Sequence, residues 1–415
     1  MKAIKSPPTR LLAIAALLAA LPAAAAPGIT DLGTLKNDNS GFSEANAVNS
    51  DGSQVLGSAD NDNGEKRAVV WSGSNWANKT DLGTLTADNS GNSGAYGLSR
   101  DGSVVVGYAL ADNGDHRATV WSGSNWTTKT DLGTFQTGNS GISAAHAVSS
   151  DGTVVVGQAI DDNYELRAAV WSGSGWGIKT NLGTLRTDNT SGSSARAVSS
   201  DGSVIVGEAV NDTGEQRATV WSGSGWTTKT DLGTLRTGNS GLSFAWGINS
   251  DGSTVVGQSD NDNGEQHAAV WSGSNWATKT DLGTLKTNNS GNSLARAASG
   301  DGSTVVGEAD NDNGERRATV WSGSNWSTKT DLGTLKTDNS GVSSVSGISA
   351  DSNFAVGYAE NDNGDTRAAV WNLRGGRAAD TANTRASLSL LSADTAAMLA
   401  QRARAAQTLL DTCRA

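Results

Sequence analysis

Three positions in this chain of 415 residues carry side chains that change from one copy of a repeated segment to the next, while their neighbours hardly change. We call them the 46, 58 and 66 positions. The 46 positions are Asn46, Tyr96, His146, Arg196, Trp246, Arg296 and Ser346. The 58 positions are Ser58, Tyr108, Gln158, Glu208, Gln258, Glu308 and Tyr358. The 66 positions are Lys66, His116, Leu166, Gln216, Gln266, Arg316 and Thr366.

Many of these side chains are of the kinds that bind ligands. Trp, Tyr and Arg dominate the binding energy at recognition surfaces. The alternative explanation is drift at tolerant, exposed positions, which seldom favours such residues. We therefore predict a ligand-binding surface formed by Asn46, Tyr96, His146, Arg196, Trp246, Arg296, Tyr108, Glu208, Glu308 and Tyr358.

Catalysis is an alternative use of the same residues. The two arginines of the 46 positions, with Glu208 and Glu308, would suit an acidic sugar. His146 or Tyr96 would then serve as the base or nucleophile of a hydrolase or lyase. However, the three histidines fall at unrelated positions of the repeat, Cys413 is the single cysteine, and no spacing typical of metal ligands occurs. We therefore assign no catalytic residue, no metal site and no cofactor.

An acidic turn recurs in every copy of the repeat. The residue equivalent to Asp62 is always Asp, and the residue equivalent to Glu65 is always Glu or Asp. The segment "DNDNGE" departs from a calcium loop because Ala59 stands where the first ligand is required. In a two-residue turn Asp62 and Glu65 would lie opposite each other and repel unless a cation is present. We expect Arg67 to neutralise them. The residue at this position is Arg in six copies and His in the remaining one, at His267.

Four strand-like runs in each 50-residue unit must hold these residues in place. In the first unit they are Ser43–Ser50, Gln54–Ala59, Lys66–Trp71 and Lys79–Leu85. The dipeptides Asp51-Gly52 and Asn63-Gly64 between them indicate two-residue hairpin turns, because both central positions of such a turn need a positive φ. Four antiparallel strands per about 40 to 50 residues predict the blade of a β-propeller.

The order of the runs at the two ends of the repeats predicts a closed ring. The array begins with Ile29–Leu35, which matches the fourth run of a unit but has no first, second or third run before it. It ends at Trp371, after the third run of the last unit, and no fourth run follows in that unit. The N-terminal run would complete the last blade and remove the exposed edges of an open array. We predict an all-β, seven-bladed β-propeller over residues 29–372. A β-solenoid is the alternative, but this order of runs would cover no exposed edge in a solenoid.

The predicted hairpins place the three variable positions at one end of the blades. With a two-residue turn after Ser50, that residue pairs with Ser53, and Asn46 faces Gly57. The 58 position follows directly, and the 66 position lies just past the next turn. We therefore expect all three positions to gather at the end that carries the Asn-Gly turns, around a funnel lined by the innermost strands.

The N-terminus predicts export. Residues 1–25 combine basic residues, an apolar stretch and an alanine-rich cleavage site, as a secretory signal peptide does. No other apolar run approaches the roughly 18 residues of a membrane-spanning helix. We expect a mature chain without a transmembrane span, secreted or associated with the outer membrane or cell surface. The formal net charge of −11 argues against a nucleic-acid partner.

A change of composition follows the repeats. Residues 373–383 form a polar linker, and residues 384–413 carry apolar side chains at the spacing of an amphipathic helix. The helix either docks on the propeller or corresponds to the linker helix that precedes an outer-membrane barrel in autotransporter-like proteins. Because the chain stops at Ala415, the second interpretation implies a translocator barrel that has been lost.

The motifs "TDLGTL", "DGSVVVG" and "RATVW" at fixed spacing resemble the HAF family of extracellular repeats, which occur in exported bacterial proteins and in autotransporter passengers. The resemblance covers about residues 29–372 and implies an extracellular repeat protein without an established chemistry. The His-Ala-Phe triplet that names the family reads Arg67-Ala68-Val69 here, so no role of its histidine is carried over.

Together these observations predict an exported bacterial binding or adhesion module that holds a surface glycan or a protein ligand at its propeller funnel. Two alternatives stay open. The first is a propeller hydrolase or lyase acting on an acidic glycan. The second is a structural, autotransporter-like passenger without a ligand.

Overall fold

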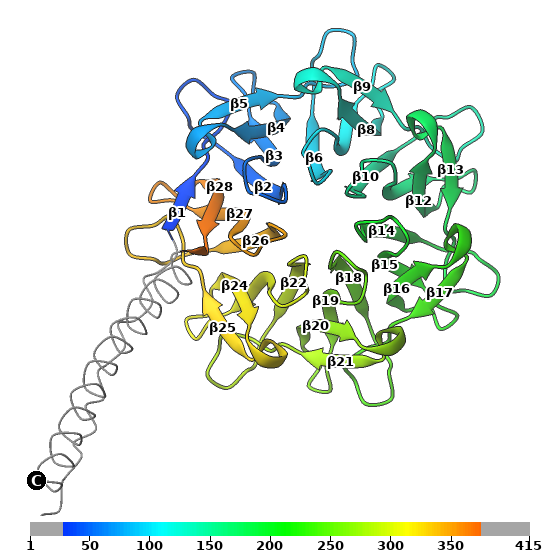
Figure 1. Cartoon of the computed structure of the whole chain (residues 1–415), viewed down its shortest axis with the longest axis vertical. Coiled ribbons are helices and arrows are strands. Elements are labelled where there is room, and N and C mark those ends of the chain that lie inside the picture. Colours follow the sequence, from blue (N-terminus) through cyan, green and yellow to red (C-terminus); the bar gives the residue numbers. More distant parts are fainter. Residues whose placement is uncertain (1–27, 375–415) are drawn as a thin grey trace, which may run out of the picture. The chain divides into compact units, whose positions relative to one another are not determined.

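Seven four-stranded antiparallel sheets stand around a central channel (Figure 1). The structure is a computed structural model, and it describes residues 28–374. The prediction of an all-β, seven-bladed β-propeller is confirmed. The predicted signal peptide (1–25), the predicted C-terminal helix (384–413) and most of the predicted linker (373–383) lie outside the described residues.

Six of the seven blades consist of four consecutive strands. Blade 1 contains β2 (Ser43–Val48), β3 (Val55–Asp60), β4 (Lys66–Ser72) and β5 (Asn78–Asp81). Blade 2 contains β6 (Ser93–Leu98), β7 (Val105–Leu110), β8 (His116–Ser122) and β9 (Thr128–Asp131). Blade 3 contains β10 (Ser143–Val148), β11 (Val155–Ile160), β12 (Leu166–Ser172) and β13 (Ile178–Asn181). Blade 4 contains β14 (Ser193–Val198), β15 (Ile205–Val210), β16 (Gln216–Ser222) and β17 (Thr228–Asp231).

The remaining blades repeat this order. Blade 5 contains β18 (Ser243–Ile248), β19 (Val255–Asp260), β20 (Gln266–Ser272) and β21 (Thr278–Asp281). Blade 6 contains β22 (Ser293–Ala298), β23 (Val305–Asp310), β24 (Arg316–Ser322) and β25 (Thr328–Asp331). Blade 7 contains β26 (Ser343–Ile348), β27 (Phe354–Glu360), β28 (Thr366–Asn372) and β1 (Gly28–Asp31). Short 3-10 turns join the third and fourth strands of blades 1 to 6, at Ser74–Trp76, Ser124–Trp126, Ser174–Trp176, Ser224–Trp226, Ser274–Trp276 and Ser324–Trp326.

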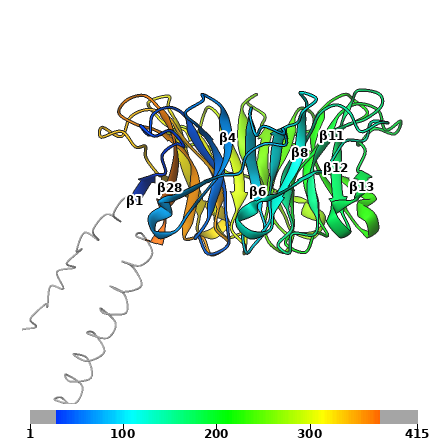
Figure 2. The ribbon, with the colours of Figure 1, turned by 90° about the horizontal axis from the view of Figure 1, so that it is seen from above.

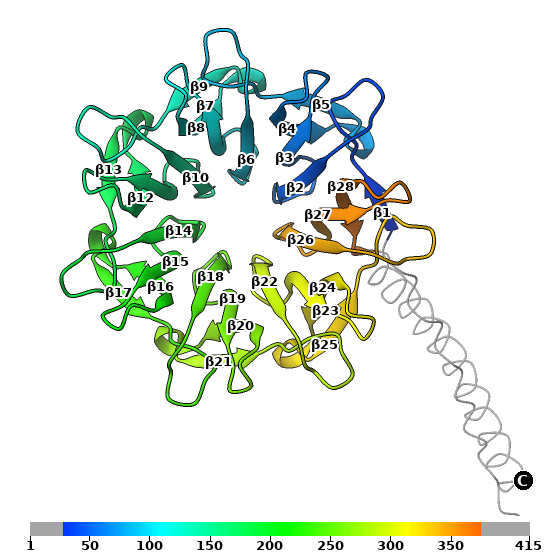
Figure 3. The same ribbon diagram turned by 180° about the vertical axis from the view of Figure 1, so that it is seen from behind.

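The ring closes in the predicted way, through the N-terminal strand. β1 pairs antiparallel with β28, with Gly28 opposite Asn372 and Asp31 opposite Ala369. Seen from behind, β1 lies at the outer edge of the blade whose inner strand is β26 (Figure 3). One blade is therefore assembled from both ends of the repeat array.

The first strand of every blade lines the channel (Figures 1 and 3). In side view the strands run between two faces that carry the loops (Figure 2). We call the face with the β2–β3 loop at Asp51-Gly52 and its six equivalents the DG face. We call the face with the β3–β4 turn at Asn63-Gly64 and its six equivalents the NG face.

The first hairpin turns more widely than predicted. The backbone N–H of Asn49 donates to the carbonyl of Gln54 at 3.0 Å, so four residues rather than two form the loop, and the predicted Ser50–Ser53 pair is wrong. The side chain of Asn49 explains the difference, because its Oδ1 accepts the N–H of Gln54 at 3.0 Å and completes the wider loop.

A β-bulge lies further along the same hairpin, where the register shifts by one residue. Ala45 pairs with Gly57 and Ala47 pairs with Leu56, so Asn46 has no partner on β3. The prediction that Asn46 faces Gly57 is therefore wrong. The same register shift occurs at the 46 position of all seven blades. A bulge re-aims the side chain of the unpaired residue, and here it turns the 46 position into the channel.

The fourth strand ends earlier than predicted, at Asp81 instead of Leu85. Gly83 adopts a φ of 73°, which an extended strand cannot accommodate, and its N–H donates to Oδ1 of Asp81 at 2.8 Å. The "DLGTL" motif is therefore mostly a turn that leads the chain into the next blade.

Apolar packing between neighbouring blades forms the core. Val106 and Val120 of blade 2 lie in one cluster with Ala145, Val155 and Trp171 of blade 3, and all five side chains are fully buried. The tryptophan equivalent to Trp171 is fully buried in every blade. These residues are Trp71, Trp121, Trp171, Trp221, Trp271, Trp321 and Trp371. Because each blade completes the core of the next, no blade is expected to be stable by itself.

The two tryptophans of one blade should contribute unequally to stability. Replacing the fully buried Trp171 with Ala leaves a large cavity and should lower the free energy of unfolding by about 3–5 kcal/mol. Trp176 is half-buried and donates from Nε1 to the carbonyl of Gly152 at 2.9 Å, so Trp176→Ala should cost about 1–2 kcal/mol. Chemical denaturation of both variants measures the difference, and equal losses would contradict the assignment of Trp171 to the core.

Candidate functional site

The 46 positions meet as one ring inside the channel. All seven side chains line a cavity of about 230 Å³, together with the small residue that follows each of them and, in five blades, the apolar residue after that. The bulges turn these side chains inward while the surrounding backbone repeats. The sequence prediction that they share one surface is therefore confirmed in placement, and ligand binding there stays a prediction.

Aromatic side chains occupy one arc of the ring. The ring centroids of Tyr96 and Tyr108 are 5.6 Å apart, and those of Tyr96 and His146 are 5.9 Å apart. Tyr108 also contacts His116, at 5.1 Å. In blade 2 the structure therefore brings the 46, 58 and 66 positions together, as the sequence predicted. Tyr96, Tyr108 and His116 also border a cavity that opens towards Ile142.

An Arg–Trp–Arg group occupies the opposite arc. The guanidinium carbon of Arg196 lies 4.7 Å from the ring centroid of Trp246, and that of Arg296 lies 5.1 Å from it. Blades 4 and 6 thus both extend a cation to the indole of blade 5. Phe244 stacks on the same indole at 6.3 Å. Each cation is attracted to the aromatic face, and this attraction fixes the position of all three side chains.

The two arginines of this group differ in charge balance. Arg196 binds Glu208 through Nε and Nη2, with a shortest distance of 2.6 Å, and Glu208 is 6% exposed. The equivalent carboxylate of blade 6, Glu308, binds Arg316 instead, at 3.3 Å. Arg296 is therefore left without an ion pair among residues 28–374. The Nε of Arg296 and the Nε1 of Trp246 are both buried and have no hydrogen-bond acceptor in the described chain.

Burial sets the protonation of the titratable groups in the ring. It lowers the pKa of His146 to about 3, with the charge of Arg196 acting in the same direction. Nδ1 of His146 lies 2.8 Å from the carbonyl oxygen of Ala195, which can only accept, so Nδ1 carries the proton. Burial also raises the pKa values of Tyr96, Tyr108 and Tyr358. At neutral pH the imidazole and the three phenols are therefore uncharged.

The remaining predicted residues lie around this ring. Asn46 donates from Nδ2 to the carbonyl of Ala95 at 2.9 Å, which bridges blades 1 and 2. Tyr358 borders a cavity with Phe42 and Glu44 at the junction of blades 7 and 1. The six predicted residues at the 46 positions therefore line the channel cavity, whereas the four at the 58 positions, Tyr108, Glu208, Glu308 and Tyr358, do not.

The acidic turns are structural. The turn at Asn63-Gly64 has three residues, because the N–H of Asn61 donates to the carbonyl of Glu65 at 3.0 Å, and the predicted opposition of Asp62 and Glu65 is wrong. Asp62 instead accepts the N–H of Asn37 at 3.0 Å, and every equivalent Asp accepts an N–H of the loop 25 residues upstream. Within the described chain, no group of three His, Cys, Asp or Glu residues is arranged to hold a metal ion.

Arg67 ties neighbouring blades together, and it also neutralises Glu65 as predicted. It is 2% exposed, and its Nη1 lies 3.1 Å from Oε2 of Glu65 and 2.8 Å from the carbonyl oxygen of Asn89, in the loop that leads into blade 2. His267 takes this position in blade 5. Its Nδ1 lies 2.8 Å from Oδ1 of Asp281.

The structure also reveals residues that the comparison of copies missed. The positions equivalent to Phe42 carry the exposed apolar side chains of Ile142, Leu242 and Val342. Arg100 is an exposed cation on the DG face, at a position that is Ser in four other copies. A comparison that had included every position of the repeat would have found both signals.

No helix among residues 28–374 has the length and apolar character that crossing a membrane would require.

Comparison with known proteins extends only to the fold. No protein-family model and no curated protein matches the chain. An oligogalacturonate lyase in complex with manganese matches with a TM-score of 0.51 and 14% identity, over 84% of this chain and 94% of that one. The BP39L lectin from Burkholderia pseudomallei matches with a TM-score of 0.43 and 12% identity, over 79% and 94%.

TolB from Acinetobacter baumannii matches with a TM-score of 0.39 and 14% identity, over 59% of this chain and about half (52%) of that one. At these identities the likenesses show a β-propeller and nothing of its function. The resemblance to HAF repeats rests on the repeat motifs alone.

Calcium should not stabilise this protein. The carboxylates of the acidic turns already accept backbone N–H groups, and Arg67 and its equivalents supply the positive charge. We expect the melting temperature after treatment with a chelator to be unchanged by millimolar calcium. A calcium-dependent rise in the melting temperature by several degrees, absent with magnesium, would overturn this account.

His267 should make the stability depend on pH. Burial alone would lower its pKa, but the hydrogen bond and charge of Asp281 and the charge of Glu265 outweigh burial, so its pKa is raised. A raised pKa gives stability that is fully present below the unfolded value of about 6.5 and is lost as the pH rises through the folded value. The melting temperature should therefore fall as the pH rises above about 6.5.

The variant His267→Arg is the matched control for this pH dependence, because it restores the residue that the six other blades carry. It should remove this part of the pH dependence and raise the melting temperature at pH 8. An unchanged profile in His267→Arg would show that His267 is not responsible.

Proposed function

We propose that this protein is an exported, non-enzymatic binding module that captures an acidic glycan within its channel, on or outside a bacterial cell. The observation that carries the proposal is the Arg–Trp–Arg group in the ring of 46 positions. An otherwise sevenfold backbone presents there an indole, two guanidinium groups and no carboxylate that faces Arg296.

Charge favours an anionic ligand. The residues that line the cavity of the 46 ring include Arg196 and Arg296 and no Asp or Glu. Glu208 already neutralises Arg196, so Arg296 retains an unbalanced charge. Arg296 is half-buried and has no ion pair among residues 28–374, and a carboxylate or sulfate group from a ligand would balance its charge through charge-assisted hydrogen bonds.

Unsatisfied donors and aromatic side chains favour a saccharide among anions. Nε of Arg296 and Nε1 of Trp246 have no acceptor among residues 28–374, and sugar hydroxyl and carboxylate oxygens accept such bonds. Across the ring, the rings and hydroxyl groups of Tyr96 and Tyr108 suit the mixed apolar and polar surface of a sugar. The pattern of a signal peptide in residues 1–25 supports a location where surface glycans occur.

Protonation favours binding over catalysis. A histidine whose pKa lies near 3 is a weak base at neutral pH, and a tyrosine whose pKa is raised is seldom the phenolate that would attack a sugar. The hydrolase or lyase alternative would require His146 to change its environment when a ligand binds. The binding module requires no such change.

A saccharide array that contains acidic and neutral glycans tests this proposal. We expect binding to acidic members, and calorimetry on the strongest one should show about 30-fold or greater weakening in Trp246→Ala and Arg296→Gln, as for central residues of a binding site. Ser346→Ala is the matched control, because Ser346 occupies the same position in blade 7.

The result that would overturn the proposal is acidic-glycan binding that survives both substitutions, or an array on which no acidic member binds. Release of unsaturated or shortened saccharides that stops in His146→Asn would favour the lyase or hydrolase instead. Melting temperatures of all variants should stay within a few degrees of the parent protein.

A further inference from the structure

A second cavity opens on the DG face, at the other end of the channel. It has a volume of about 540 Å³, and residues from all seven blades line it. Small-molecule sites in proteins have volumes of about 300–1,000 Å³, apolar walls and a few well-placed polar groups. The volume of the cavity on the DG face falls within that range, and both apolar and polar side chains line it, whereas the cavity of the 46 ring is smaller.

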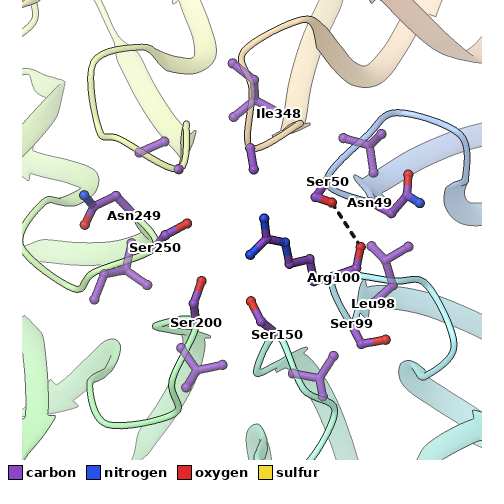
Figure 4. Close-up of a pocket in the computed structure, with 17 residues that line it drawn as sticks. Asn49, Ser50, Leu98, Ser99, Arg100, Ser150, Ser200, Asn249, Ser250 and Ile348 are labelled. Carbon is purple, nitrogen blue, oxygen red and sulfur yellow. Dashed lines mark hydrogen bonds between the residues drawn. The ribbon is translucent and has the colours of Figure 1, made fainter.

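One cation stands over this opening. Figure 4 shows the side chain of Arg100 extending towards the middle of the ring that contains Ser50, Ser150, Ser200 and Ser250. Arg100 is the single charged residue among the 17 that line the cavity. Among residues 28–374 its guanidinium group has no ion pair, and only its backbone groups form hydrogen bonds.

The backbone around the opening is fixed by hydrogen bonds between blades. The N–H of Arg100 donates to the carbonyl of Ser150 at 3.1 Å, and the N–H of Ser150 donates to the carbonyl of Ser200 at 3.0 Å. The same bond continues through Ser250 and Gly300 to Ala350. These amides are therefore satisfied. The groups left to meet a ligand are the Arg100 guanidinium and the hydroxyls of Ser150, Ser200 and Ser250.

Apolar side chains line the cavity beneath this polar rim. They are two residues before the rim position in each blade, namely Val48, Leu98, Val148, Val198, Ile248, Ala298 and Ile348. Some of them reach the neighbouring cavity of the 46 ring as well. A ligand that entered from the DG face would thus meet a cation and hydroxyls first and an apolar ring below them.

The nearby carboxylates do not compete for Arg100. Asp101 and its equivalents lie on the same loops, but they do not line the cavity. Their oxygens accept hydrogen bonds within their own loops, as Asp101 does from Ser99 at 2.7 Å and from the N–H of Ser103 at 3.0 Å. These bonds lower the pKa of Asp101 and hold its carboxylate within the loop.

We propose that the opening on the DG face binds a small carboxylate with an apolar body, of the size of an arylalkanoate. The carboxylate would form a two-pronged hydrogen bond with the guanidinium of Arg100, a geometry in which arginine and carboxylate match. The apolar body would pack on the ring of Val, Leu and Ile side chains. Its cation and hydroxyl groups are distinct from those of the acidic-glycan site proposed above, although five apolar side chains border both cavities.

Titration with phenylacetate tests the proposal, with phenylacetamide and acetate as matched ligands. Phenylacetate should bind at least about tenfold more tightly than either, because the amide lacks the charge and acetate lacks the apolar body. Arg100→Ser should weaken phenylacetate binding to the level of phenylacetamide. This variant carries the residue that four other blades have at the same position, so its melting temperature should be unchanged.

The sevenfold backbone permits a rescue. Placing the cation on another blade, in Arg100→Ser with Ser200→Arg, should restore phenylacetate binding, because the rim position repeats around the same cavity. Trp246→Ala should leave phenylacetate binding unchanged, which separates this site from the glycan site. Equal binding of phenylacetate by the parent protein and Arg100→Ser, or no binding by either, would overturn the proposal.

Discussion

The buried arginine that joins each blade to the next is the contact on which the rest of the molecule depends. Arg67 reaches across to the carbonyl of Asn89, and Glu65 accepts the N–H of Gly91 at 2.6 Å in the same loop. Six blades carry the arginine, and each donates from Nη1 to the equivalent Asn carbonyl. Burying these charges is costly, so the carboxylates and carbonyls around them must stay in place. These bonds fix the loop between blades to the blade that precedes it.

This rigidity separates folding from recognition. Most contacts between blades use positions that hardly vary, and the bulge at each 46 position leaves one side chain without a partner in the sheet. That side chain can be Trp, Arg, Tyr or Ser without disturbing its neighbours. Trp246 is the clearest case, since the other thirteen tryptophans occupy the two fixed positions of the repeat and pack between blades or against the loops.

The fold could be predicted from the sequence because its determinants are periodic and local. The 50-residue spacing gave the blade, and the displaced N-terminal run predicted the closure by β1. The hairpin details could not be predicted, because the dipeptides Asp-Gly and Asn-Gly indicate a turn without fixing its length. Side chains that precede them, such as Asn49 and Asn61, accept backbone N–H groups and enlarge the loops. The bulge at Asn46 is a separate register shift beyond the loop, and the dipeptides carry no signal for it.

For the candidate site too, the sequence predicted which residues come together but not the details of their contacts. Variation among copies identified which residues meet in the channel, because equivalent positions of a closed ring must face one another. It did not predict that Glu208 would pair with Arg196 while Glu308 pairs with Arg316, since the choice depends on a third residue of each blade. Arg100 was missed because its position varies little, between Ser, Gly and Ala, apart from the one copy that carries the charge.

The distribution of charge links these observations to one property of the channel. The chain as a whole has a formal net charge of −11, yet the residues that line the two channel cavities include Arg100, Arg196 and Arg296 and no carboxylate. An acidic exterior repels anions at long range, but salt screens this effect beyond about 10 Å, whereas charges in a narrow channel act over a few ångströms. Selection for an anion would therefore occur after a ligand has reached the opening. Because the backbone repeats seven times, only the side chains that break the symmetry can supply that selection, and three of them are arginines.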